Sequence, residues 1–523
     1  MTDYSPLFSS SLTRRDLLRA AAGGLVVPRV STPSRAANPI VAENQKPGTT
    51  DWQLTYVRSE NHRSPMIEGY CSRASVRPDE TITFHLSADP ATDVTIDLYR
   101  MGYYQGTGGR HVERLGPVAV EPRPDPPVQA HRLRECRWPP AAALEIPGDW
   151  TSGVYLGKLS ARAHRYQSYV IFIVRDERGA DLLFQCSDAT WQAYNKWPGE
   201  YSLYDSDPPV QPHSARTWVS FDRPYGKYPQ VVDQPLSQGS GEFLLWEYPL
   251  CFWLEKEGYD VTYQSNIDTH RDGEGLRRGQ CFLSVGHDEY WSRQMFDNVK
   301  EAVEEGLSAA FLSGNSVKWM IALEPATLFS PADVDLRTGL MNDGSRIPAR
   351  PGSHATPYRT IYRRGRFGGL SMAEKARENY AGPFPVEGPN ENTLIGARNP
   401  SPPNGSADWT VRDAGHWIFD GTGVKAGDRI PGLVGWEFQG RPVADIPGLR
   451  VVASGQTTNS SGSRSDYAAT VYPGPQDNWV FNAATIFWSM GLSNPPGVIP
   501  PHSHFGRPHG PDGRVQQITA NFF

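Results

Sequence analysis

The chain has 523 residues, of which 38% are hydrophobic and 21% charged, as expected for a globular protein with more than one domain. Its formal net charge of −6 argues against a nucleic-acid partner, and no apolar run approaches the ~20 residues of a membrane-spanning helix. The 50 glycines and 46 prolines exceed average usage, which predicts long ordered loops because 11% of the residues are aromatic and can be buried.

The N-terminal residues follow the pattern of an export signal. A twin arginine, Arg14-Arg15, precedes a modest apolar segment from Ala20 to Val27, and Ser34-Arg35-Ala36-Ala37 loosely matches a small-residue cleavage site. We therefore expect residues 1–37 to be a twin-arginine-type signal peptide and the mature protein to be periplasmic or secreted. The alternative is a disordered basic tail.

Residues 56–176 have the pattern of β-structure. Apolar and polar residues alternate from Thr81 to Leu86 and from Asp93 to Leu98, and Tyr169 to Val174 is wholly apolar. Turn-rich segments separate these runs, as they do in β-sandwiches. We predict an immunoglobulin-like β-sandwich domain over residues 38–178.

From Leu182 onward, short apolar strands alternate with helical patterns, which predicts a parallel sheet with crossover helices. The predicted strands are residues 182–186, 259–263, 280–285 and 309–313, and the predicted helices are 242–257, 292 to about 306, and 482–491. Residues 179–523 are thus expected to form an α/β domain with a mostly parallel sheet. The whole chain is then an α+β multidomain protein; its segment 315–453 has no clear pattern.

The five cysteines show no CxxC spacing, so a structural zinc site is not expected. Cys71 and Cys136 lie in the same predicted domain. They form one disulfide in an oxidising compartment or remain buried thiols, and the sequence leaves both open. The remaining cysteines are Cys186, Cys251 and Cys281.

The segment from Leu283 to Trp291 is the most informative part of the chain. An apolar strand ends at Gly286, an ionisable cluster follows, and Ser292 then opens an amphipathic helix. Ligands bind at the carboxyl ends of strands in open α/β folds, and His287 and Glu289, two residues apart, can face one crevice. The simpler interpretation is that the acidic residues only favour the helix N-terminus.

No activated nucleophile is evident in the sequence. Gly239-Ser240-Gly241 lacks the GxSxG spacing, and Cys281 lies at the start of its strand rather than at the glycine turn. The polar groups at that turn are instead oxygen-rich or imidazole side chains.

Six short motifs occur in one order: Glu68-Gly69-Tyr70, Tyr99 to Tyr104, Thr190 to Asn195, Gly286 to Trp291, Gly314-Asn315 and Val434 to Glu437. Together they resemble the catalytic region of the large subunit of N,N-dimethylformamidase and its relatives, over roughly Tyr56 to Leu492. The resemblance implies a metal-dependent hydrolase of a C–N amide bond with a small amide substrate. It indicates the bond type and not the substrate.

The resemblance also implies a mononuclear ferric site, with one Fe³⁺ per chain held by two tyrosines and one glutamate. By motif, Tyr194 is the first tyrosine and Glu289 the glutamate. Tyr225 fits best as the second tyrosine, and Tyr204 is the alternative. The surrounding catalytic residues of the family match three further positions: His287, Asn315 and Glu437.

These residue types suit the implied chemistry. Fe³⁺ is a hard Lewis acid that favours anionic oxygen ligands, and a phenolate qualifies once the metal has lowered the tyrosine pKa. The ion polarises a carbonyl or lowers the pKa of water. Glu437 is suited to act as general base, and His287 and Asn315 to orient the carbonyl or stabilise an oxyanion.

The competing hypothesis is an exported, non-catalytic binding or structural protein on the same scaffold. The 15 tryptophans and 23 tyrosines would suit the binding of a carbohydrate or another polymer by stacking. Convergence of Tyr194, the second tyrosine, Glu289 and Glu437 on one cavity favours the hydrolase. A homo-oligomer is left open.

Overall fold

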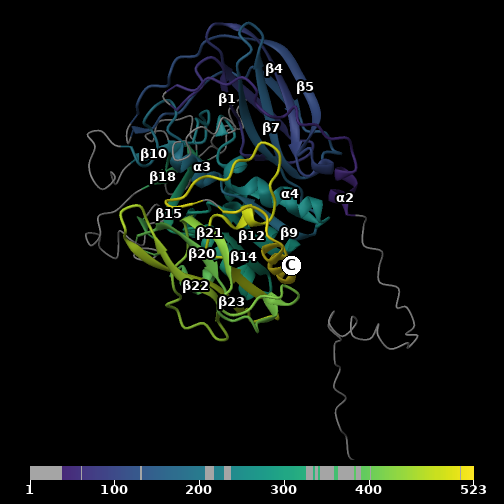
Figure 1. Cartoon of the computed structure of the whole chain (residues 1–523). Coiled ribbons are helices and arrows are strands. Elements are labelled where there is room, and N and C mark those ends of the chain that lie inside the picture. Colours follow the sequence, from purple (N-terminus) through teal and green to yellow (C-terminus); the bar gives the residue numbers. More distant parts are fainter. Residues whose placement is uncertain are drawn as a thin grey trace, which may run out of the picture. The chain divides into compact units, whose positions relative to one another are not determined.

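The computed structural model describes residues 38–60, 62–129, 132–205, 217–228, 237–325, 390–400, 402–506 and 508–523, and short strands between 334 and 383. The predicted signal peptide, residues 1–37, lies outside them. Residues Pro39–Phe523 form one compact unit with mixed α and β structure, which is mostly sheet with few helices (Figure 1). The predicted domain boundary near residue 178 stays a prediction.

Two sheets make up the N-terminal region. One has the order β1-β3-β6, with β1 Glu68–Cys71, β3 Thr81–Ser87 and β6 Ala142–Glu145. The other has the order β2-β8-β7-β4-β5, with β2 Ser75–Val76, β8 Gln167–Val174, β7 Gly153–Ala161, β4 Thr92–Met101 and β5 Gly109–Val120.

One hydrophobic core joins these two sheets. It contains the apolar residues of both alternating runs, including Ile82 and Phe84 from β3 and Val94 and Ile96 from β4. The predicted strands over 81–86, 93–98 and 169–174 are confirmed, since they lie within β3, β4 and β8. The immunoglobulin-like assignment stays a prediction.

A nine-stranded sheet forms the rest of the core, in the order β11-β9-β12-β14-β24-β23-β22-β20-β21. Its first five strands are parallel: β11 Val261–Ser265, β9 Ala180–Cys186, β12 Gly279–Gly286, β14 Ser308–Ser313 and β24 Trp479–Asn482. Its last four pair antiparallel: β23 Arg464–Pro473, β22 Arg450–Thr458, β20 Asn404–Thr410 and β21 Arg429–Glu437.

The expected mostly parallel sheet is thus corrected to a mixed one. The antiparallel strands come largely from the segment without a clear pattern, where turns rather than crossover helices join neighbouring strands. A further sheet has the order β10-β18-β15-β13 with β19 on β15, and β16 pairs with β17. These strands are β10 Thr217–Ser220, β13 Tyr290–Ser292, β15 Trp319–Pro325, β16 Val334–Asp335, β17 Leu340–Met341, β18 Tyr358–Tyr362 and β19 Gly382–Pro383.

The helices are short, and none among the described residues is long and apolar enough to cross a membrane. The α-helices are α2 Pro39–Asn44, α3 Asp188–Tyr194, α4 Tyr248–Lys256, α5 Asn266–Arg271, α6 Arg293–Glu304, α9 Asn392–Ile395 and α10 Gly513–Phe522. The 3₁₀ turns are η1 Tyr104–Gly106, η5 Glu274–Arg278, η7 Trp417–Phe419 and η8 Trp488–Gly491, and a π-turn, η4, spans Phe243–Glu247.

Helix α6 confirms the predicted start at Ser292. The Ser292 hydroxyl accepts a hydrogen bond from the backbone N–H of Met295, at 3.0 Å, and so caps the helix. The predicted apolar stripe from Met295 to Val303 is buried against the sheet.

The predicted final helix over 482–491 is wrong. Asn482 instead ends β24, and η8 occupies only the last part of the segment. Residues from Val480 to Leu492 are all buried, so the segment lacks the solvent-exposed face of a surface helix. All five cysteines are buried and unpaired, so Cys71 and Cys136 form no disulfide in this structure.

The order of the parallel strands determines where a site can form. From β9 the chain first adds β11 on one side and then β12 on the other, followed by β14 and β24. Figure 1 labels β9, β12 and β14 of this series. The order in which strands are added to the sheet therefore reverses between β9 and β12, although the strands themselves stay parallel. The carboxyl ends of strands at such a switch point border the crevice in which ligands bind.

Candidate active site

Three strand ends at this switch point carry predicted site residues. Helix α3 follows β9 and ends at Tyr194, His287 and Glu289 follow β12, and Asn315 follows β14. Gly286 makes the turn after β12 with a φ of 69°, and a Cβ there would lie 2.7 Å from the Cβ of Trp246. Only glycine suits this turn, because it needs a left-handed backbone and leaves no room for a side chain.

Carboxylates surround the buried imidazole of His287. Its Nδ1 lies 3.1 Å from Oε2 of Glu242, and its Nε2 lies 3.3 Å from Oε2 of Glu289 and in close contact with Oε2 of Glu437. Burial lowers the pKa of His287, but Glu437 and Glu242 outweigh it and hold that pKa well above its usual range. Burial raises the pKa of Glu289, but His287 outweighs it, so this pKa is lowered. The cluster thus places one imidazole among three carboxylates.

His287, Glu289 and Glu437 also form a set that is able to hold a metal ion. Each offers one ligand atom, these atoms lie within 4.8 Å of one another, and all three residues are buried. Such a spacing is compatible with one shared ion.

Tyrosine hydroxyls lie on the other side of Glu289. The Tyr194 hydroxyl donates a hydrogen bond to Oε2 of Glu289 at 2.8 Å, and the Tyr204 hydroxyl donates to the Tyr194 oxygen at 3.0 Å. Tyr204 also makes a close contact with the hydroxyl of Tyr290. Burial and the neighbouring Glu289 raise the pKa of Tyr194 well above its usual value, so the phenol stays protonated unless a cation binds.

Tyr225 does not join this cluster. Its ring packs edge-on against Trp191, with ring centroids 6.1 Å apart, and it lines a small cavity together with Trp191 and Asp188. Its side chain interacts with that of Gln192. Of the two candidates for the second tyrosine, Tyr204 is the one that the structure places beside Tyr194, because the chain folds back directly after α3.

Asn315 is fully buried, and neither its amide nitrogen nor its amide oxygen has a hydrogen-bond partner among the described residues. Leaving a buried polar group unpaired costs about 1–3 kcal/mol. The residue also has a left-handed backbone, with φ at 48°. Strain and an unpaired amide at one position indicate a group that meets a ligand.

Close backbone packing brings Glu437 to the same place. A Cβ on Gly314 would lie 2.3 Å from the carbonyl oxygen of Glu437, so the glycine allows the ends of β14 and β21 to touch. Trp436 precedes Glu437 with φ at 59°, and its backbone N–H donates to the Ser503 hydroxyl. Oε2 of Glu437 is buried and has no aligned hydrogen bond among the described residues, although it contacts His287.

Residues 95–502 of the chain match the family described as N,N-dimethylformamidase beta subunit-like, C-terminal. The chain belongs to this family. It is also similar to the N,N-dimethylformamidase beta subunit of Paracoccus aminophilus, with 25% identity over 278 aligned residues; the match covers 46% of this chain and 34% of that relative. The chain thus matches about a third of the relative's length. The resemblance to a formamidase is confirmed at family level, and the large-subunit assignment stays a prediction.

Three groups near the site escaped the sequence analysis: Glu242, Tyr228 and the side chain of Asp288. Tyr228 is buried and packs edge-on against Tyr194, with centroids 5.9 Å apart. Asp288 accepts hydrogen bonds from Ser284 and Gln185, each at 2.7 Å, and so anchors the turn from behind. Burial raises the pKa of Asp288 to about 6, against these hydrogen bonds. Gly239 and Gly241, just before Glu242, were the sequence feature that could have indicated a tight turn leading to it.

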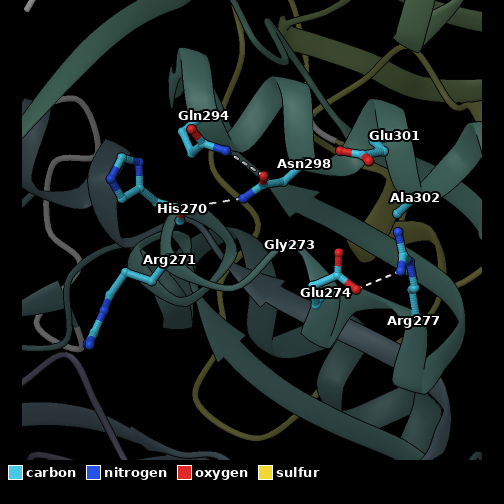
Figure 2. Close-up of a pocket in the computed structure, with 9 residues that line it drawn as sticks. All are labelled: His270, Arg271, Gly273, Glu274, Arg277, Gln294, Asn298, Glu301 and Ala302. Carbon is cyan, nitrogen blue, oxygen red and sulfur yellow. Dashed lines mark hydrogen bonds and ion pairs between the residues drawn. The ribbon is translucent and has the colours of Figure 1, made fainter. Parts of the chain in front are cut away.

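A surface hollow elsewhere in this family member is not the site. It lies between α5, η5 and α6, and Figure 2 shows it lined by polar and charged side chains. Several of them bond to one another: Gln294 donates to Asn298 at 2.7 Å, and Arg277 pairs with Glu274 at 2.6 Å. No predicted site residue lines it, so its groups are those of a solvated surface.

Proposed function

We propose that the protein is a metal-dependent hydrolase of the C–N bond of a small amide. One observation carries the proposal: Tyr194, Glu289, His287 and Glu437 meet in one buried cluster at the carboxyl end of β12. All four residues lie inside the region that matches the formamidase family. Convergence of this kind favours catalysis over a binding or structural role.

The oxygen donors fit a ferric ion. The Tyr194 and Glu289 oxygens are 2.8 Å apart and the Tyr194 and Tyr204 oxygens 3.0 Å apart, which suits atoms that share an ion at about 2 Å. Phenolates and a carboxylate are hard anionic ligands of the kind that Fe³⁺ favours. We therefore propose Tyr194, Tyr204 and Glu289 as ligands, with Tyr204 in place of Tyr225. When bound, such an ion polarises an amide carbonyl or acidifies water.

The other residues of the cluster supply proton transfer and charge stabilisation. The buried Glu437 carboxylate is placed to accept a proton from water, and His287 beside it is placed to carry that proton onward. The unpaired amide N–H of Asn315 is free to donate to the oxyanion that forms when water attacks the amide carbon. Proton return to the departing amine completes the cleavage.

A second candidate is a site for a divalent ion. His287, Glu289 and Glu437 alone offer one imidazole nitrogen and two carboxylate oxygens, and both donor types bind Zn²⁺ in proteins. The non-catalytic alternative keeps the scaffold and its ion but has no turnover. Its occupant would be a carbohydrate or another polymer.

Metal analysis and a visible spectrum of the purified protein test the proposal. Tyrosinate bound to Fe³⁺ gives a charge-transfer band, and Tyr204→Phe should shift or remove it. Tyr225→Phe is the matched control and should leave the band unchanged. A colourless protein with stoichiometric zinc would refute the iron assignment. Iron without hydrolysis of any short N-alkyl formamide or acetamide would favour the non-catalytic alternative.

We also propose export by the twin-arginine route, supported by Arg14-Arg15 and the apolar segment after them. Replacing both arginines with lysine should retain the protein in the cytoplasm. Unchanged export on cell fractionation would contradict this proposal.

A further inference from the structure

We infer that Glu242 is a positioning residue that holds the imidazole of His287, with Nδ1–H donated to Glu242 and Nε2 directed at the reacting groups. The catalytic consequence of this inference rests on the proposed hydrolase function. The structural part does not, because it concerns one hydrogen bond and the orientation of one ring.

Two glycines before Glu242 allow the backbone to place it beside His287. Gly239 and Gly241 have φ of 85° and 59°, and a Cβ on them would lie 2.0 Å from the Tyr169 carbonyl oxygen and 2.6 Å from the Trp191 ring. Both positions therefore require glycine, for conformation and for space. The π-turn Phe243–Glu247 follows at once, and π-turns are frequent at functional sites.

The contacts of Glu242 point to one role. The residue is 1% exposed, its Oε2 lies 3.1 Å from Nδ1 of His287, and its Oε1 has no hydrogen-bond partner among the described residues. The opposite ring nitrogen, Nε2, faces Glu289 and Glu437. A carboxylate on one ring nitrogen and reacting groups on the other is the arrangement that orients catalytic and metal-binding histidines and selects their tautomer.

A purely structural ion pair would be arranged differently. Glu242 adds a third carboxylate to a buried cluster that already contains Glu289 and Glu437 around a single imidazole. Burying such an excess of negative charge is costly, and apolar side chains of similar size would often stabilise the fold as well or better. A role in the function of His287 accounts for the charge.

The hydrogen bond is tested directly by ¹⁵N NMR of histidine-labelled protein, which reports which ring nitrogens carry protons. The chain has 13 histidines, so the His287 signals are taken from the difference spectrum against His287→Gln. Gallium(III) in place of iron keeps a loaded site diamagnetic. We expect a protonated Nδ1 in the wild type and in Glu242→Gln, whose amide oxygen still accepts, and an increased Nε2–H tautomer in Glu242→Leu. A bare Nδ1 in the wild type would overturn the inference, whatever the activity.

Kinetics test the consequence. Glu242→Leu should lower kcat by about 10–100-fold with little change in KM or metal content, and Glu242→Gln should recover part of this loss. Glu247→Gln is the matched control, since Glu247 is equally buried five residues on but accepts from Trp191 and the Ser187 backbone. A loss no larger than that of Glu247→Gln would overturn the positioning role.

A wild type without metal and without amidase activity refutes the proposed function, and the Nδ1 measurement still decides the role of Glu242. If Glu242→Leu fails to fold, the wild type and Glu242→Gln spectra decide it.

Discussion

Two buried ionic clusters of this protein differ in one respect that separates structure from function. In the Arg100 cluster, defined by Glu43, Arg100, Tyr104, Arg110 and Glu255, two guanidinium groups face two carboxylates. Arg100 binds both oxygens of Glu255, at 2.8 and 2.9 Å, and Tyr104 and Arg110 donate to Glu43 at 2.8 and 2.6 Å. Each of its carboxylates is matched by a guanidinium and is hydrogen-bonded, and Lys46 adds a further ion pair to Glu43 at 2.7 Å.

The His287 cluster, defined by Glu242, His287, Glu289 and Glu437, is not balanced. Among the described residues, one imidazole faces three carboxylates, and an oxygen of Glu242 and one of Glu437 lack aligned hydrogen bonds. The Arg100 cluster joins β4, α2 and α4 and is complete without a ligand. An excess of one charge and unpaired atoms, rather than burial itself, therefore indicate where a cation or substrate binds.

The comparison predicts the largest effect at Glu289. Glu289→Ala removes the carboxylate that contacts both Tyr194 and His287, so we expect loss of bound metal, of the visible band and of all activity. Iron per chain and the absorbance spectrum measure this. A variant that keeps stoichiometric iron would show that Glu289 is not a ligand.

Glu437→Gln separates ligand from base. The amide cannot accept the proton, so turnover should fall by about 10²–10⁴-fold while the metal and its colour remain. Steady-state hydrolysis of short N-alkyl formamides and acetamides measures turnover, and metal analysis measures the bound metal. Release of the metal instead would make Glu437 a ligand and would favour the His287–Glu289–Glu437 set.

A substitution in the Arg100 cluster should lower the free energy of unfolding and leave metal binding and activity of the folded protein unchanged. Glu255→Leu leaves Arg100 buried and unpaired, which typically costs 3–5 kcal/mol, on the order of half of a domain's stability. Urea unfolding measures the loss, and the folded fraction should keep its metal. Adding Arg100→Met should restore much of the stability; if it does not, the pair is more than a balanced ion pair.

The smallest predicted effect is on acid stability. Burial raises the pKa of Glu43, but Arg100, Lys46, Tyr104 and Arg110 outweigh it and lower it from 4.5 to about 2. A lowered pKa stabilises the fold above the unfolded value, so on the order of 3 kcal/mol is lost as pH falls from about 4.5 to 2. Glu43→Gln should therefore be less stable at neutral pH, with a flatter profile over that window. An unchanged slope in urea titrations at several pH values would contradict this.

Local sequence patterns were sufficient to predict those strands and helices that are specified by residues a few positions apart. The alternation in β3 and β4 and the apolar stripe and serine cap of α6 were predicted, since period and capping are set by residues only a few positions apart. The cluster after Gly286 was also predicted, because a strand end and a glycine turn place it at a crevice.

Tertiary structure alone decided which distant residues meet there. Tyr204 and Tyr225 both follow Tyr194 and carry the same group, and only the fold places Tyr204 against it. The antiparallel half of the nine-stranded sheet and the approach of Glu242 to His287 were likewise undetermined by sequence. The physical reason is that strand pairing and side-chain contacts across such separations depend on surfaces that exist only once the chain has folded.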